Sequence, residues 1–109
     1  MKTLKFTPDL CVLILAGTKT STWRLFDDKN LQVGDELLFI NSKTLESFGT
    51  AVITKLGIKT LATLTEADWE GHERFASEEI MYQTYRGFYG DKVSPETEVK
   101  LLQFSFTSE

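Results

Sequence analysis

The chain has 109 residues, of which 41% are apolar and 26% charged, and its net charge of -4 gives an isoelectric point near 5.0. This length predicts one soluble domain over residues 1–109, with enough apolar residues to bury a modest core. The acidic balance argues against sequence-independent binding to a nucleic-acid duplex, which needs a broad basic face. It permits a small cationic pocket for one phosphate or one nucleotide.

Metal and membrane chemistry have little support in the composition. Cys11 is the only cysteine and His72 the only histidine, so an internal disulfide is impossible and no zinc site is expected. Residues 1–6 lack the apolar segment of a signal peptide, and the longest apolar run, 10–16, is about a third of a membrane span. We therefore expect a cytoplasmic protein with no metal, no cofactor and no membrane contact.

The predicted elements mix strands and helices. Alternating apolar and polar residues over 3–6 predict an opening strand, and Thr7-Pro8-Asp9 is typical of a helix start. The first helix is apolar on nearly all sides, which predicts that it is largely buried. In chain order, we expect a strand 3–6, a helix 8–16, strands 18–26, 36–40 and 48–58, a short helix from 66 to about 70, a helix from 77 to 90 and a strand 99–106.

Local signals refine two of these elements. Thr65 and Asp68 have the spacing of a capping box, with aspartate in place of the usual glutamate. The long strand 48–58 is expected to bend at Gly49 or Gly57. Short strands that are mostly adjacent in sequence are typical of the α+β class. We favour a small barrel-like mixed sheet flanked by helices, and the order of elements alone does not exclude an open sheet.

The densest group of polar chemistry is an eight-residue stretch that starts at Gly17 and has the form G-x-K-T-x-T-x-R. Lys19 is a compact cation whose pKa falls readily on desolvation, and Arg24 can clamp a phosphate or carboxylate. Thr22 offers a hydroxyl, and a lysine beside such a hydroxyl is a possible base and nucleophile pair. The residues alone leave open a second interpretation, a solvated threonine-rich edge strand.

This stretch and its surroundings resemble the ASCH domain (activating signal cointegrator homology), which belongs to the PUA-like superfamily of small β-barrels. The resemblance covers the chain from Leu4 to Phe106 and implies a single ASCH domain with a PUA-like fold. It rests on the motif after a helix and on later landmarks, namely Val33-Gly34-Asp35, Gly49-Thr50-Ala51-Val52-Ile53, Leu64-Thr65-Glu66 and Glu70-Gly71.

The resemblance implies recognition of RNA or a nucleotide in a cleft beside the motif, because ASCH domains are generally proposed to bind RNA. The residues expected to bind a ligand or nucleic acid are Lys19, Thr20, Trp23, Arg24 and His72. A scaffold or partner-binding domain is an alternative. In that case the hydroxyls of Thr20 and Thr22 would bond to the backbone, and Arg24 to a carboxylate such as Asp35.

A further alternative is a hydrolase. One bacterial ASCH branch hydrolyses the amide of 4-acetylcytidine with a lysine, a threonine and a glutamate, and some ASCH proteins are reported to cleave RNA. The resemblance places the lysine and threonine on Lys19 and Thr22 and leaves the glutamate open. An ungapped match falls on His72, a shift of one residue falls on Glu73, and Glu70 is a third choice. The expected catalytic set is therefore Lys19, Thr22, Glu73 and Glu70.

Several aromatic and imidazole side chains have two open interpretations. Trp23 can stack on a base or face the core, and we expect the core. Tyr85 and Phe88 are expected in the core because of their helical spacing, with Tyr89 and Arg86 at the border of the cleft. His72 can titrate near neutrality or hold a ligand carbonyl, and a lone histidine is more often structural.

Overall fold

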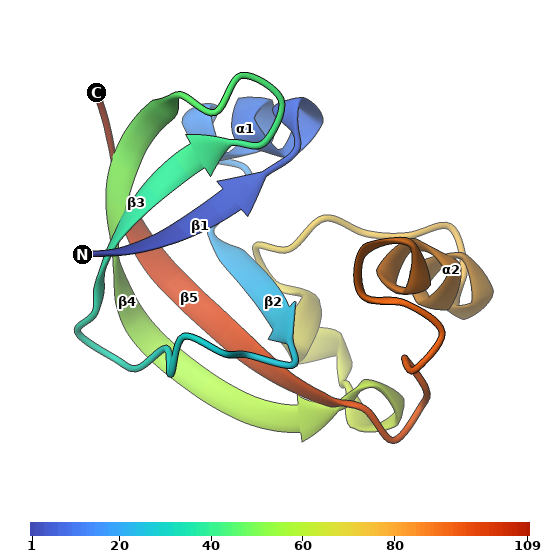
Figure 1. Ribbon diagram of the computed structural model, residues 1–109. Helices are drawn as coiled ribbons and strands as arrows, with labels where there is room; N and C mark the ends of the chain where they lie inside the picture. Colours follow the sequence, from blue (N-terminus) through green and yellow to red (C-terminus); the bar gives the residue numbers. More distant parts are fainter.

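The computed structural model describes residues 1–109 as a five-stranded mixed sheet with two α-helices (Figure 1). The strands are β1 (Lys2–Phe6), β2 (Ser21–Leu25), β3 (Glu36–Asn41), β4 (Ser47–Thr60) and β5 (Glu98–Ser108). The helices are α1 (Pro8–Leu15) and α2 (Glu78–Tyr89). Two short 3-10 turns, η1 (Leu61–Thr63) and η2 (Glu66–Trp69), lie between β4 and α2.

The strand order β1-β3-β4-β5-β2 places β1 and β2 at the two edges of the sheet. β1 pairs with β3 in parallel, and the other pairs are antiparallel. The long strands β4 and β5 curve strongly, which brings the edges toward each other and forms a half-barrel (Figure 1). We call the line along which the edge strands β1 and β2 approach each other the seam. The guanidinium of Arg24 on β2 reaches across the seam and donates to the backbone carbonyl of Lys5 on β1 over 3.0 Å. The predicted α+β mixed sheet with flanking helices is confirmed, and the sheet forms a half-barrel.

The curvature of β4 is accompanied by two irregularities of register. One lies beside Gly49, opposite β3, and the other lies between Ile53 and Lys55, opposite β5. Gly57 pairs regularly with Leu101, so no irregularity of register lies at that glycine. At Gly49 a Cβ atom would lie 2.6 Å from the backbone carbonyl oxygen of Thr107, so close packing of the strands requires glycine there.

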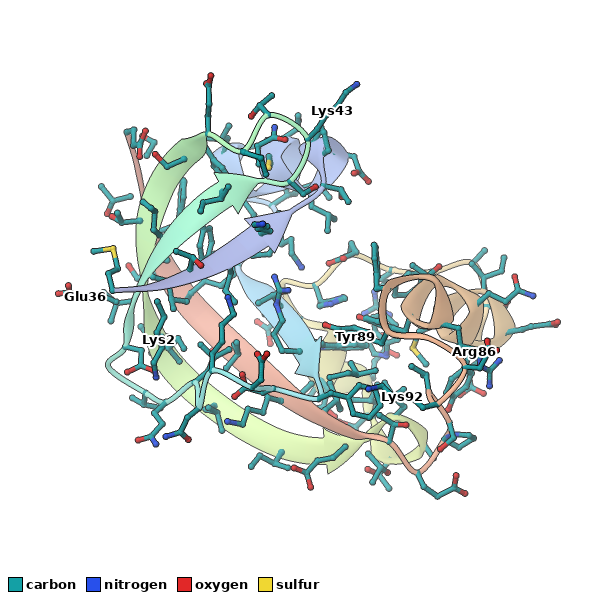
Figure 2. The ribbon with its side chains drawn as sticks, viewed as in Figure 1. Lys2, Glu36, Lys43, Arg86, Tyr89 and Lys92 are labelled. Carbon is teal, nitrogen blue, oxygen red and sulfur yellow. The ribbon has the colours of Figure 1, made fainter.

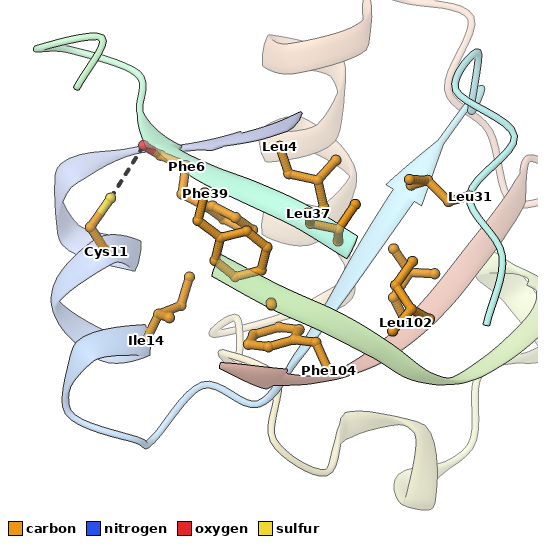
Figure 3. Close-up of a cluster of buried hydrophobic side chains, with 11 residues drawn as sticks. Leu4, Phe6, Cys11, Ile14, Leu31, Leu37, Phe39, Leu102 and Phe104 are labelled. Carbon is orange, nitrogen blue, oxygen red and sulfur yellow. Dashed lines mark hydrogen bonds between the residues drawn. The ribbon is translucent and has the colours of Figure 1, made fainter. Parts of the chain in front are cut away.

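The larger core cluster lies between the sheet and α1 (Figure 3). Phe39 is fully buried at its centre, with its ring centroid 4.7 Å from that of Phe6 and 5.0 Å from that of Phe104. These pairs are tilted or edge-to-face, which is the geometry that aromatic quadrupoles favour. Eleven buried residues belong to this cluster, and all are apolar or cysteine.

The first helix is less buried than its composition predicts. Only Cys11 and Ile14 are buried in α1, whereas Val12 and Leu15 are 63% and 53% exposed. Eight residues make little more than two turns, so one narrow stripe reaches the sheet and the rest faces outward. The helix ends as predicted, with Gly17 at a φ of +80°. Neither helix of the protein is long and apolar enough to cross a bilayer.

A second core cluster packs β2 and β5 against α2 and the segment after β4. Its seven buried members are Trp23, Leu25, Leu61, Met81, Tyr85, Val93 and Val99. Ser77 caps α2 by accepting from the N–H of Ile80, and Asp68 accepts from the N–H of Thr65, so both predicted helix starts are confirmed. Figure 2 shows Tyr89 and Lys92 near the end of β2, and Lys43 at the distant hairpin between β3 and β4.

Candidate functional site

A pocket of about 340 Å³ opens at the seam between the edge strands and is bounded by α2. This volume lies in the range of small-molecule sites. β2 supplies Thr22, Trp23 and Arg24 to its wall, the loop after η2 supplies His72 and Glu73, and α2 supplies Tyr85, Phe88 and Tyr89. The pocket therefore adjoins the second half of the G-x-K-T-x-T-x-R motif.

The loop after η2 is fixed on the start of β2 by backbone hydrogen bonds. The carbonyl of Gly71 accepts from the N–H groups of Thr20 and Ser21 over 2.9 and 3.1 Å, and the hydroxyl of Ser21 donates to the carbonyl of Glu70. Gly71 has a φ of +74°, and a Cβ atom there would lie 2.1 Å from the hydroxyl oxygen of Thr20. Only glycine allows the loop to lie this close to the start of β2. This contact places His72 and Glu73, the next two residues, against the motif.

Lys19 and Glu73 form an ion pair behind the pocket wall. The ammonium of Lys19 contacts the carboxylate of Glu73 and donates to the carbonyl of Ser21 over 2.7 Å. The Lys19 side chain is only 1% exposed, whereas that of Glu73 is 22% exposed and lines the pocket. Burial lowers the pKa of Lys19, and the charge of Glu73 opposes this shift. Lys19 therefore holds Glu73 in place and does not itself line the pocket.

The structure separates two of the expected site residues from the others. Glu70 is exposed and faces a different hollow, which Lys55 also lines. Thr20 is exposed beside the loop and does not line the pocket. Of the three choices for the acidic residue, Glu73 is the carboxylate that reaches both Lys19 and the pocket.

His72 is buried, and its ring stacks on that of Trp23 at a centroid distance of 3.9 Å. Burial and the nearby charge of Lys19 lower the pKa of His72 to about 3, which favours the structural interpretation of this histidine over titration near neutrality. Its Nδ1 lies 2.7 Å from the backbone carbonyl of Glu73, which can only accept, so Nδ1 carries the proton. Nε2 is then an acceptor, which suits a ligand N–H group and not a ligand carbonyl.

Three other side chains at the pocket have unused hydrogen-bonding capacity. Thr22 and Tyr85 are each 5% exposed, and their hydroxyls make no hydrogen bond within the protein. The guanidinium of Arg24 lies 5.1 Å from the ring of Phe6, and its Nε is buried without a partner. Buried polar atoms are nearly always satisfied in folded proteins, so unpartnered ones at a pocket indicate a place for a ligand or water.

This arrangement differs from the one expected for a scaffold. Asp35, the expected carboxylate partner of Arg24, instead pairs with Lys2 at 2.7 Å. Neither Thr20 nor Thr22 uses its hydroxyl in a hydrogen bond to the backbone, and a pocket lies beside the motif.

The aromatic predictions hold in part. Trp23 is 3% exposed and belongs to the second core cluster as expected, yet its ring also forms part of the pocket wall. Tyr85 is buried and Tyr89 borders the pocket, as predicted. Arg86 was expected beside Tyr89 and instead lies outside the pocket, where its Nε donates to the carbonyl of Val93. Phe88 was expected in the core and is 61% exposed at the pocket. The sequence does not predict that Tyr85 lines the pocket. Its spacing from Met81 is the spacing of any residue on the buried face of a helix.

Cations without carboxylate partners gather on this side of the molecule. Five of the twelve lysines and arginines pair with carboxylates: Lys2, Lys19, Lys59, Arg74 and Lys100. Among the other seven, four line the pocket or a hollow of about 530 Å³ beside it: Lys5, Arg24, Lys29 and Lys92. The acidic chain thus carries a local cationic site. No group of three or more His, Cys, Asp or Glu side chains is arranged to hold a metal ion.

Sequence comparison finds no matching family model and no matching curated protein. Solved structures are similar in fold. A DUF984-family protein from Enterococcus faecalis superposes with a TM-score of 0.76 at 16% identity, over 92% of this chain and 71% of that one. The ASCH domain from Lactobacillus crispatus superposes with a TM-score of 0.70 at 19% identity, over 93% of this chain and 72% of that one. ASCH from Zymomonas mobilis superposes with a TM-score of 0.64 at 16% identity, over 94% of this chain and 65% of that one.

These likenesses assign the curled mixed half-barrel with its two helices to the PUA-like α+β class. Within that class the chain has the fold of an ASCH-like domain, so the predicted resemblance is confirmed at the level of fold.

Proposed function

We propose that the protein is an RNA- or nucleotide-recognition domain that binds its ligand in the seam pocket. Arg24 is the observation that carries this proposal. Its guanidinium lies at the pocket with one nitrogen buried and unpartnered, and no carboxylate neutralises it, on a chain of net charge -4. A guanidinium fork matches the oxygens of a phosphate. The ASCH-like fold supports the same function, because ASCH domains are generally proposed to bind RNA.

The pocket wall suits a nucleic-acid base. Trp23, His72 and Tyr85 supply flat rings, and stacking on such rings contributes about 1–3 kcal/mol per base. The hydroxyls of Thr22 and Tyr85 can donate or accept, whereas Nε2 of His72 and the carboxylate of Glu73 accept. The acceptors favour a base edge that carries amino or imino N–H groups.

The test is a titration of single-stranded oligonucleotides and mononucleotides, followed by fluorescence anisotropy and by tryptophan quenching. Arg24→Gln keeps a donor for the carbonyl of Lys5 but removes the charge. We expect affinity to fall at least about 10-fold, because hydrogen bonds to charged groups contribute about 1.5–3 kcal/mol. Arg86→Gln is the matched control, since Arg86 lacks a carboxylate partner but lies outside the pocket. Unchanged affinity in a folded Arg24→Gln variant contradicts the proposal.

A second candidate function is hydrolysis of the amide of an acylated pyrimidine nucleoside such as 4-acetylcytidine. The observation that favours it is the pairing of Lys19 with Glu73 beside the free hydroxyl of Thr22. Water or the Thr22 oxygen would attack the amide carbon, and Glu73 would take the proton of the nucleophile and pass it to the leaving nitrogen as the C–N bond breaks. Attack by Thr22 would leave an acetyl ester that water then hydrolyses.

A chromatographic assay on 4-acetylcytidine tests this candidate. Release of cytidine by the wild type that is lost in Glu73→Gln and kept in Glu70→Gln would establish the enzyme. Glu70→Gln is the control because Glu70 lies outside the pocket. Absence of release by the wild type rules this hydrolysis out and leaves recognition alone. Incubation with a labelled single-stranded RNA tests cleavage of RNA in the same way.

A further inference from the structure

The seam pocket continues into a second hollow. The two cavities share Lys5, Arg24, Phe88 and Tyr89 in their walls, so they form one groove that runs past the guanidinium of Arg24. The second hollow has a volume of about 530 Å³ and lies between the residues that follow β2 and the end of α2. Recognition of a single base in the first pocket makes no use of this space.

Phe26 lies in the wall of the second hollow in a conformation that is rare for a bulky residue. Its φ is +52°, in the left-handed region, and its side chain is 43% exposed. The ring lies edge-to-face against Tyr89 at 5.9 Å, and the ammonium of Lys92 is 4.2 Å from its centroid. Such backbone strain is concentrated at ligand sites, where the position of the side chain outweighs its cost.

Phe26, Phe88 and Tyr89 together form an aromatic rim along the groove. Phe88 is 61% exposed, so two of the three rings present apolar surface to solvent. Lys5, Lys29 and Lys92 line the same hollow and have no carboxylate partners. Figure 2 shows Tyr89 and Lys92 near the tip of β2.

The acidic groups of the hollow do not cancel this charge. Asp27 is held by Lys100 at 2.7 Å and accepts two backbone N–H bonds, so its charge is already compensated. Asp28 is the other carboxylate in the wall. Exposed rings interleaved with unpaired cations are the arrangement found where proteins bind single strands of nucleic acid.

On the basis of the proposed function, we propose that the second hollow is a subsite for a neighbouring nucleotide of the same strand. Its base stacks on Phe26 and Phe88. The phosphate between the two nucleotides lies at Lys5 and Arg24, which both cavities share. The ligand is therefore a single-stranded RNA segment of two or more nucleotides, which binds more tightly than a free nucleotide.

The test compares the four 5′-mononucleotides with the four homopolymeric RNA hexamers, for the wild type and for a variant that carries both Phe26→Ala and Phe88→Ala. Hexamer affinity of this variant should fall between about 5-fold and about 150-fold, as expected for loss of one stacked base. Because Phe88 also lines the first pocket, mononucleotide affinity is compared for Phe26→Ala alone, and it should stay within about 2-fold of the wild type. Lys92→Ala should weaken hexamer binding by a smaller factor. Thermal unfolding checks that each variant is folded.

Leu45→Ala and Lys43→Ala are matched controls from the distant hairpin. Leu45 is 66% exposed and has a φ of +62°, so it shares both the exposure and the backbone conformation of Phe26. Lys43 is exposed and, like Lys92, has no carboxylate partner. Neither substitution should change hexamer affinity.

Three outcomes would overturn the subsite. If mononucleotides bind and the double variant binds hexamers like the wild type, the subsite is wrong and the proposed function stands. If neither mononucleotides nor hexamers bind the wild type, both proposals fail. If a hexaglutamate peptide binds as tightly as the hexamers, and the double variant leaves its affinity unchanged, the cations alone attract acidic chains and no base is stacked.

Discussion

The two ends of the half-barrel differ in what their interiors contain. The cluster between the sheet and α1 buries eleven residues around Phe39, with only apolar side chains and one cysteine. The cluster beneath α2 has seven, and four of the five buried polar residues of the protein lie on or next to β2 at its border. Those four are Lys19, Ser21, Thr22 and His72.

This difference indicates a division of labour. Burial of a polar group without a partner costs free energy, and Nε1 of Trp23 and Nε of Arg24 are buried at the seam pocket without a partner. The half around Phe39 has no such groups, so its packing can offset the cost of the other half. If this is correct, substitutions in the first half should change the free energy of unfolding, and those at the pocket should chiefly change binding.

The largest effect is expected in the first half. Phe39→Ala removes a fully buried ring and should lower the free energy of unfolding by about 3–5 kcal/mol. Urea denaturation followed by circular dichroism measures this change. Phe88→Ala is the control, because its ring is 61% exposed and its loss should cost less than about 0.5 kcal/mol. Equal losses of unfolding free energy for the two substitutions would contradict the division of labour between the two halves.

The second prediction concerns how His72, at the pocket, makes the free energy of unfolding depend on pH. Its pKa is about 3 in the folded protein and 6.5 in the unfolded chain, so the unfolded chain takes up the proton first as the pH falls. The stability that neutral His72 contributes is complete above pH 6.5 and is lost as the pH falls toward 3. Between about pH 7.5 and about pH 4.5 the loss should be about 2.5 kcal/mol.

Urea denaturation at both pH values, for the wild type and His72→Asn, isolates this contribution. The asparagine retains a donor for the carbonyl of Glu73 but has no titratable ring. The variant should lose clearly less stability than the wild type over the same interval. Parallel losses would mean that His72 is protonated in the folded protein at the lower pH.

Local signals in the sequence predict the elements of both halves equally well. The capping residues Ser77, Thr65 and Asp68 and the stop at Gly17 act over a few residues, so they can be identified without knowledge of the fold. The edges of the sheet and the closeness of β1 and β2 depend on contacts between distant strands. The resemblance to ASCH domains, and not the pattern of elements, predicted that the sheet would curl.

The candidate site was only partly predictable, again for a physical reason. The choice among Glu70, His72 and Glu73 depends on the backbone bonds from Gly71 to the start of β2, which no alignment of short motifs contains. Tyr85 has the spacing of a core residue, and its unpartnered hydroxyl is a property of the packing around it. Phe26 gives no sign in the sequence of its positive φ.

The third prediction tests whether the pair of Lys19 and Glu73 is charged. Glu73→Gln leaves the buried ammonium of Lys19 without its anion and should lower the free energy of unfolding by about 2 kcal/mol. This is less than for a fully buried pair, because Glu73 is 22% exposed. Adding Lys19→Met should restore part of the loss, which a double-mutant cycle of denaturation curves measures. A Glu73→Gln variant as stable as the wild type would indicate that Lys19 is neutral.

The smallest effect on stability is expected for Tyr85→Phe, which removes only a hydroxyl that has no partner in the protein. The free energy of unfolding should change by less than about 0.5 kcal/mol, while affinity for RNA should fall about 2-fold to 10-fold through the loss of one hydrogen bond to the ligand. Tyr82→Phe, on the same helix but outside the pocket, should change neither quantity. A less stable Tyr85→Phe variant with unchanged affinity would place this hydroxyl in the packed interior, and Tyr85 would then belong with the residues that stabilise the fold.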